Sequence, residues 1–180
     1  MAKSPKVKIY CAAAMSGRMQ DEMRCDADML VRVLINHGFE PLSPVVEEHI
    51  PYVHEPLKQT SEEQLRRFWA RDKEMLHDAD ILLDYMSCNK SDGVSNEIGL
   101  MRYGLWKPVV RVWPSAPKFN ISQIEHDVIV ESLADAIAVI KDRWGDYKKL
   151  GSWRKAMLDR CFGKWVGQHH EMNARYGVHV

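Results

Sequence analysis

The residues best suited to chemistry lie in the polar stretch SDGVSNEIG, which spans 91–99. It follows an apolar run over 80–86 that is typical of a buried strand, and it leads into a helical pattern over 96–105. Gly93 lets the backbone pass close to a ligand. The stretch is therefore predicted to join a strand to a helix, at the edge where parallel sheets bind their ligands.

Glu97 is the candidate nucleophile of this stretch. Ser95 or Asn96 is expected to cap the helix, which places Glu97 in its first turn. Free N–H groups there attract a phosphate or a carboxylate, and the helix dipole favours the ionised form of Glu97. An ionised carboxylate placed against a sugar is what a covalent glycosyl intermediate requires. The alternative is that Glu97 is only a favourable charge near a helix start.

The order of the predicted elements and the segment SDGVSNEIGLMRYGLWKPVV resemble the nucleoside 2-deoxyribosyltransferase superfamily. Within it, the chain is most similar to the 2'-deoxynucleoside 5'-monophosphate N-glycosidases, over residues 7–144. Ile9-Tyr10 at the first strand and Ser16-Gly17-Arg18 in the loop after it carry part of the resemblance. The motif S-x-G-V-x-x-E-x-G carries the rest, and it is formed here by Ser91, Gly93, Val94, Glu97 and Gly99.

The resemblance implies a role for several acidic residues and one tyrosine. Glu97 would attack the anomeric carbon of the sugar, and Tyr10 would hydrogen-bond and orient its carboxylate. Asp72 would contact the sugar hydroxyl or help to protonate the departing base, with Asp80 as the fallback. Asp92 would serve as a further catalytic acid if its side chain turns into the site.

The resemblance also implies a site for a 5'-phosphate. The glycosidases carry Ser at the position of Ser91, where the transferases usually carry Asp. A cradle is predicted from Ser16, Gly17 and Arg18, because Arg binds phosphate through two hydrogen bonds and loop N–H groups add donors. Ser122 of a neighbouring subunit would complete this cradle, which predicts a homodimer or a higher homo-oligomer.

Three functions remain open at this point. The leading hypothesis is an N-glycosidase that cleaves the base–deoxyribose bond of a 2'-deoxynucleoside 5'-monophosphate through a glycosyl-Glu intermediate. The alternative is a nucleoside 2-deoxyribosyltransferase that moves deoxyribose between bases, and a further alternative is a non-catalytic nucleotide-binding sensor. None of them needs a metal or an organic cofactor. The four cysteines form no CxxC pair, so their spacing argues against a zinc site.

A scaffold must bring these distant residues together. Short apolar runs occur over 7–14, 39–43, 80–86 and 108–113, and helical patterns occur over 20–37, 61–79, 96–105 and 131–144. This alternation predicts an α/β fold, a doubly wound parallel sheet of the Rossmann or flavodoxin-like kind. The segment 44–60, which contains three prolines, is predicted to be a loop. The catalytic domain is expected over 1–147 and a helical extension over 148–180.

The extension is expected to contain an extra C-terminal amphipathic helix from Trp153 onward. Its apolar stripe either packs on the parent domain or forms a subunit interface. A helix with several large apolar side chains must bury them in one of these two ways.

Composition limits the partners. The chain has 180 residues, with 25 Lys and Arg against 25 Asp and Glu, so its formal net charge is zero with His neutral. Nucleic-acid binders usually show a basic domain, so no nucleic-acid polymer is expected and a local site must hold any anion. No apolar run approaches the roughly 18 residues of a membrane span, and the N-terminus lacks the apolar core of a signal peptide. We therefore expect a cytoplasmic protein that acts on a small nucleoside or nucleotide, with no membrane partner.

Overall fold

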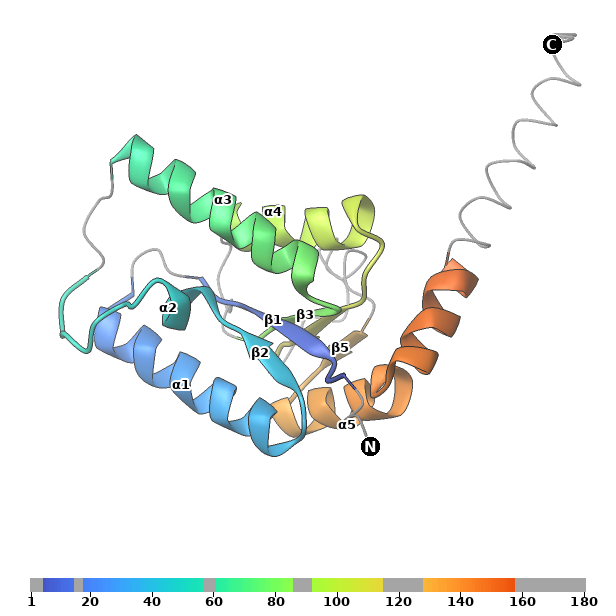
Figure 1. Ribbon diagram of the computed structural model, residues 1–180. Helices are drawn as coiled ribbons and strands as arrows, with labels where there is room; N and C mark the ends of the chain where they lie inside the picture. Colours follow the sequence, from blue (N-terminus) through green and yellow to red (C-terminus); the bar gives the residue numbers. More distant parts are fainter. Residues whose placement is uncertain (1–4, 15–17, 57–60, 86–91, 115–127, 158–180) are drawn as a thin grey trace, which may run out of the picture.

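A single parallel sheet organises the described part of the chain. The computed structural model describes residues 5–14, 18–56, 61–85, 92–114 and 128–157 (Figure 1). The strands are β1 (Lys8–Ala12), β2 (Glu40–Leu42), β3 (Ile81–Asp84), β4 (Val109–Val112) and β5 (Val128–Val130). All pair in parallel, in the order β2-β1-β3-β4-β5. This is the flavodoxin-like order of the doubly wound fold, so the predicted fold class is confirmed.

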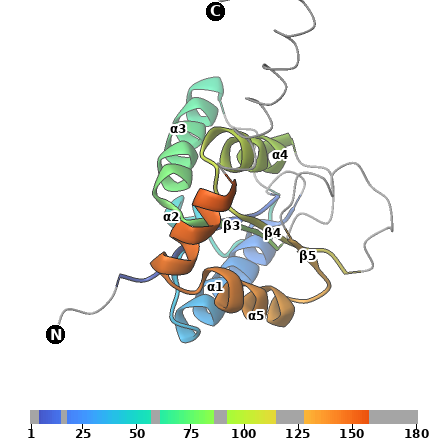
Figure 2. The same cartoon turned by 90° about the vertical axis from the view of Figure 1, so that its right-hand side faces the viewer.

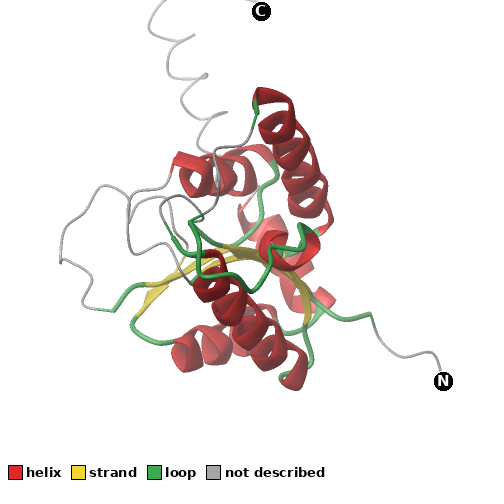
Figure 3. Cartoon of the chain, turned by 90° about the vertical axis from the view of Figure 1, so that its left-hand side faces the viewer, coloured by secondary structure: helices red, strands yellow, loops and turns green. Residues whose placement is uncertain are grey.

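Helices cover both faces of the sheet. They are α1 (Gln20–Asn36), α2 (Pro44–Glu47), α3 (Glu62–Asp78), α4 (Asp92–Gly99), the π-helical turn η1 (Leu100–Gly104) and α5 (Leu133–Trp144). Helices α1 and α5 lie on one face, and α3 and α4 lie on the other (Figures 1 and 2). Figure 3, in which the strands are yellow, shows the sheet between these two helical layers. No helix among the described residues is long and apolar enough to span a membrane.

Strand alternation decides which side chains reach the face under α3 and α4. On β1, Ile9 and Cys11 pack with the core of the α1 and α5 face, whereas Tyr10 packs with Ile98 of α4 on the opposite face. Because successive strand residues point to opposite faces, the side chain of Tyr10 points towards α4. The sheet therefore presents an aromatic hydroxyl to the helix that carries Glu97.

Local sequence signals explain the start of α3 and the end of α1. The side chain of Ser61 accepts a hydrogen bond from the N–H of Gln64, and the side chain of Gln64 accepts one from the N–H of Ser61, which forms a capping box before α3. Gly38 stops α1 with a φ of 90°, a conformation that favours glycine. The N–H of Phe39 then bonds to the carbonyl of Leu34, which closes the helix end.

Two predicted features of the secondary structure are wrong, and one strand was not predicted. Helix α4 begins at Asp92 and not at residue 96, β5 was not predicted at all, and α2 interrupts the predicted loop over 44–60. Strand β5 and helix α2 are three and four residues long, too short for a periodic pattern to reveal. The apolar side chains of α3 are buried only in part, since Leu65 is 55% exposed.

The helix over 147–157 packs on the parent domain, at the amino ends of the strands. It begins six residues before the predicted start at Trp153. The hydroxyl of Tyr147 donates hydrogen bonds of 3.0 Å to the Lys6 carbonyl and to Asp80, and Arg154 pairs with Asp80 at 3.4 Å. The remainder of the predicted extension, 158–180, lies outside the described residues.

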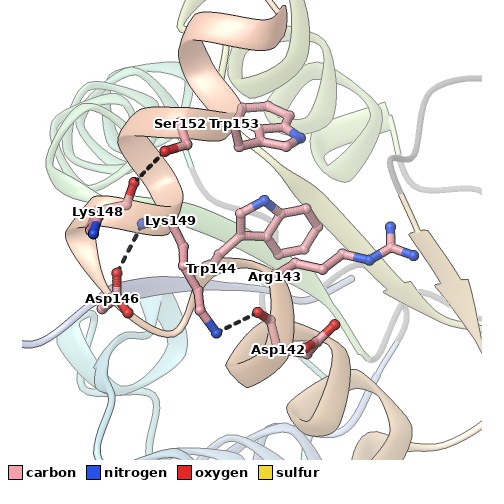
Figure 4. Close-up of a pocket in the computed structure, with 8 residues that line it drawn as sticks. All are labelled: Asp142, Arg143, Trp144, Asp146, Lys148, Lys149, Ser152 and Trp153. Atoms are coloured by element: carbon pink, nitrogen blue, oxygen red, sulfur yellow. Dashed lines mark hydrogen bonds between the residues drawn. The ribbon is translucent and has the colours of Figure 1, made fainter.

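A pair of tryptophans fills the corner between α5 and this helix (Figure 4). The rings of Trp144 and Trp153 are 6.0 Å apart and nearly perpendicular, at 86°. The indole nitrogen of Trp144 is buried without a hydrogen-bond partner among the described residues, and it is turned towards Trp153. An N–H group directed at an aromatic face is stabilised by the negative charge of that face, which accounts for this nitrogen.

Candidate active site

Glu97 and Tyr10 form a buried pair between α4 and the sheet. The phenolic hydroxyl of Tyr10 donates a hydrogen bond of 3.0 Å to Oε1 of Glu97. Glu97 is 6% exposed, and its Oε2 has no hydrogen-bond partner among the described residues. The two side-chain oxygens therefore differ: Oε1 accepts the hydrogen bond from Tyr10, and Oε2 is buried without a partner among the described residues.

Asp72 brings a second buried carboxyl group to this site. It lies on α3, which packs against β1, and it is 6% exposed. Its Oδ1 is buried and has no hydrogen-bond partner in the described part of the chain. Burial raises the pKa of Asp72 to about 6, and the negative charge of Glu48 adds to the rise, while Arg71 opposes it. Asp72 therefore holds a proton more readily than a carboxyl group in water.

The pKa of Glu97 is raised further than that of Asp72. Burial raises its pKa to about 8, the negative charges of Asp72 and Asp84 add to the rise, and the hydrogen bond from Tyr10 opposes it. The sequence predicted that a helix start would keep Glu97 ionised. That prediction is wrong, because Glu97 is the sixth residue of α4 and the loss of solvation outweighs any effect of the helix dipole.

Asp72 and Glu97 consequently titrate as a coupled pair. Each negative charge makes the second ionisation harder, so the pair loses its two protons in separate steps near pH 6 and pH 8. Between these values the two carboxyl groups share one proton. In that form the proton lies mainly on Glu97, because its pKa is the higher of the two.

An ion pair at the carboxyl ends of β3 and β4 was not anticipated from the sequence. Nε of Arg111 lies 3.0 Å from Oδ2 of Asp84, which is 1% exposed. The guanidinium group of Arg111 also stacks over the ring of Trp113, 4.2 Å from its centre. A charged residue inside each of two apolar strand segments, DILLDYM and PVVRVW, was the signal that could have revealed this pair.

The predicted phosphate cradle is only partly described, and its described member has a partner. Arg18 forms an ion pair with Asp26 of α1. The first N–H groups of α1 are also in use, because Gln20 donates to the Glu55 carbonyl at 2.9 Å and Asp21 donates to the Val53 carbonyl at 3.1 Å. The start of α1 is thus occupied by the protein's own chain, which leaves these N–H groups without capacity for an anion.

The other predicted site residues separate into three groups. Gly93, Ser95 and Asn96 are exposed within α4, so neither Ser95 nor Asn96 caps a helix. Asp80, the fallback acid, lies at the amino end of β3 and binds the backbone N–H of Lys8, so it is remote from Glu97 along the strand direction. The residues outside the described part are Ser16, Gly17, Ser91, Ser122 and the side chain of Asp92.

Metal ligands do not gather in the described ranges. No group of three or more His, Cys, Asp or Glu side chains there is arranged to hold a metal ion. The chemistry that the described site offers is that of two carboxyl groups and a phenol.

Among the comparisons with known proteins, the one with solved structures agrees with this fold. No model of a known protein family matches the chain. No curated protein matches its sequence. Among solved structures, a 2-deoxyribosyltransferase from Bacillus psychrosaccharolyticus is similar at a TM-score of 0.56 and 25% identity, over 80% of this chain and 96% of that one. A conserved protein from Enterococcus faecalis V583 is similar at a TM-score of 0.53 and 17% identity, over 77% and 99% of the two chains.

A third structure, the CMP N-glycosidase BcmB from Clostridium botulinum, has a TM-score of 0.45 and 14% identity, over 74% of this chain and 98% of that one. A similarity of that size carries no conclusion by itself. The strand order and the similarity to the 2-deoxyribosyltransferase agree with the motif around Glu97. The similarity at 25% identity supports a relation of the chain to the nucleoside 2-deoxyribosyltransferase-like superfamily.

Proposed function

We propose that the protein is an enzyme that cleaves the N-glycosidic bond of a 2'-deoxynucleoside 5'-monophosphate through a covalent intermediate on Glu97. The observation that carries this proposal is the buried Tyr10–Glu97 pair, in which one oxygen of Glu97 has no partner among the described residues and a second buried carboxyl group, Asp72, lies near. Enzymes that hydrolyse glycosidic bonds with retention use two carboxyl groups in these two roles.

The proposed reaction has two steps. In the first, Oε2 of Glu97 bonds to C1' of the sugar, the C1'–N bond breaks with its electron pair going to the base, and Asp72 donates a proton to the base. In the second, water attacks C1', the bond to Glu97 breaks, and the water's proton passes to Asp72. The products are a free base and deoxyribose 5-phosphate, and both carboxyl groups return to their starting states.

The raised pKa values set the working pH of this mechanism. Attack needs ionised Glu97, and departure of the base needs protonated Asp72. The higher pKa of Glu97 places the shared proton on Glu97 in the free protein, so this proton must first pass to Asp72. The coupled pair holds one proton between about pH 6 and pH 8. The proposal therefore includes a bell-shaped dependence of kcat/KM on pH, with limbs near those two values.

Transfer of deoxyribose to a second base is the other candidate, with the same intermediate. The similarity at 25% identity to a 2-deoxyribosyltransferase favours it. The pairing of Arg18 with Asp26 favours it too, because that arginine is already neutralised and would have to change partner to hold a phosphate. In this variant a free base, and not water, attacks C1' of the glycosyl-enzyme.

A panel of deoxynucleosides and their 5'-monophosphates, with free base measured by chromatography, tests the proposal. Glu97→Gln should lower base release at least about a thousandfold, because it removes the nucleophile. The control is Glu74→Gln, which changes an exposed glutamate of α3 and should leave the rate unchanged. Retained activity in Glu97→Gln would refute the mechanism.

Two additions to this assay separate the alternatives. A second free base in the reaction yields a new nucleoside or nucleotide if the enzyme transfers, and only base and sugar phosphate if it hydrolyses. Tight binding of a nucleotide without any released base would instead support the non-catalytic sensor.

The proposal extends to a homodimer in the cytoplasm, in which Ser122 of one subunit reaches the phosphate held by the other. Mixing the inactive variants Glu97→Gln and Ser122→Ala tests this arrangement. Mixed dimers that contain one intact site should regain activity with the monophosphate. Activity that stays at the level of the separate variants would contradict a shared site.

A further inference from the structure

Asp84 is a charged residue in the most buried part of the sheet. It is the last residue of β3, and it pairs in register with Ala12 of β1 and with Arg111 of β4. Its strand neighbour two positions earlier, Leu82, packs on the same face as Tyr10. Because strand side chains alternate, Asp84 also points to the face that carries Glu97.

Arg111 is fixed beside Asp84 by two independent contacts. Its Nε lies 3.0 Å from Oδ2 of Asp84, and its guanidinium plane stacks over Trp113 at 4.2 Å. Its side chain is only 12% exposed. Stacking and charge pairing together hold an arginine in one orientation, since the planar group is stiff and weakly hydrated.

The polar groups that act on Glu97 in the described part of the chain come from three separate elements. Asp72 approaches from α3, Asp84 from β3 and the hydroxyl of Tyr10 from β1, while Arg111 of β4 adjoins Asp84. Three carboxyl groups in one buried volume repel one another when ionised, so the last of them holds its proton. A cation that neutralises Asp84 removes part of this repulsion.

We propose that Asp84 and Arg111 are a positioning pair that sets the charge of Glu97, with Arg111 neutralising Asp84 so that Glu97 can ionise and attack. Neither residue contacts the reacting atoms in this role. The inference rests on the proposed function of Glu97 as nucleophile. It concerns the ionisation of Glu97 in the free protein, however, and this is measurable without any substrate.

The test follows the carboxyl signal of Glu97 by NMR in protein labelled with ¹³C at its glutamate carboxyl groups, assigned by its loss in Glu97→Gln. Asp84→Asn removes a negative charge and leaves Arg111 to attract Glu97, so the titration should move to lower pH by about one unit. Arg111→Gln leaves Asp84 without its cation, so the titration should move to higher pH by a similar amount. The double variant Asp84→Asn with Arg111→Gln should return close to the parent value.

Two further variants serve as controls for the effect of charge. Arg111→Lys keeps the charge and should leave the titration nearly unchanged, even though it loses the stacked geometry. Arg66→Gln breaks an exposed ion pair with Glu62 on α3 and should not move the signal of Glu97. If Arg111→Gln does not fold, the shift in Asp84→Asn alone decides the question.

The limb of the kcat/KM profile near pH 8 should move in the same direction as the NMR titration in each variant. A purely structural pair would lower the rate at every pH and leave that limb in place. An unmoved titration, or shifts of the same sign in both single variants, would overturn the inference. Opposite shifts in a protein that releases no base from any nucleotide would uphold the inference and refute the proposed function.

Discussion

The hydroxyl of Tyr10 lies 3.0 Å from Oε1 of Glu97, a hydrogen bond between residues 87 positions apart in the chain. It joins the middle of the first strand to the helix after the third, so the fold itself brings these two side chains together. The bond lowers the pKa of Glu97, against the larger effect of burial. Tyr10 therefore both orients the proposed nucleophile and eases its ionisation.

Tyr10→Phe should lower kcat/KM by roughly 10- to 100-fold, the effect of losing a hydrogen bond to a charged group. The limb of the profile near pH 8 should also move to higher pH, because Glu97 loses the donor that favours its charged form. Initial rates measured from pH 5 to pH 9.5 check both effects. Tyr147→Phe is the matched control, since it removes the hydroxyl that bonds to Asp80 at the amino ends of the strands. An equal effect in both variants would mean that the hydroxyl of Tyr10 has no special role.

The stability of the protein should fall as pH rises between about 6 and 8. The folded pKa of Glu97 is about 8, against an ordinary value of 4.5. The folded state thus binds more protons than the unfolded state in this window, so the free energy of unfolding decreases with rising pH by at most about 1.4 kcal/mol per pH unit. Asp72, with a folded pKa of about 6, adds a decrease of the same sign at lower pH.

Glu97→Gln separates these two contributions. It should flatten the dependence between pH 6 and pH 8, and it should leave the decrease below pH 6 that Asp72 causes. Urea unfolding midpoints at half-unit pH intervals give the measurement. A slope between pH 6 and pH 8 that survives this substitution would show that another group titrates there.

Glu48 should control the acidic limb of the rate profile. Its side chain is 12% exposed and lies 3.4 Å from Arg71, and its charge raises the pKa of Asp72. Glu48→Gln should therefore move the limb near pH 6 to lower pH by up to about one unit. Glu47 is the matched control, because it pairs with the same arginine at 3.2 Å but is 53% exposed. Equal shifts in both variants would assign the effect to Arg71 and not to Glu48.

The helix over 147–157 should contribute stability without affecting the chemistry. Leu150 is buried in the core cluster under α5, so Leu150→Ala should lower the free energy of unfolding by about 2–5 kcal/mol. The shape of the pH–rate profile should stay unchanged, because this helix lies at the amino ends of the strands, whereas Glu97 lies between α4 and the middle of β1. Lys148→Ala, an exposed change on the same helix, is the control. A shifted profile in Leu150→Ala would reveal a connection between the two ends of the sheet.

The local signals in the sequence were sufficient for most of the scaffold. The apolar runs gave four of the strands, Ser61 and Gln64 marked the start of α3, and Gly38 marked the end of α1. The pairing of Tyr10 with Glu97 was also expected, although through resemblance to a family and not through spacing. These features were predictable because helix and strand periods, caps and stops depend on residues a few positions apart.

The sequence by itself predicted that Glu97 follows a buried strand and lies on the helix after it. Only the tertiary structure decided the charge of that residue, since burial and the approach of Asp72 and Asp84 come from three separate elements. It also decided that Asp84 meets Arg111 across two strands, and that the segment 53–56 occupies the start of α1. A pKa and an ion pair depend on distances through space, which no local pattern along the chain records.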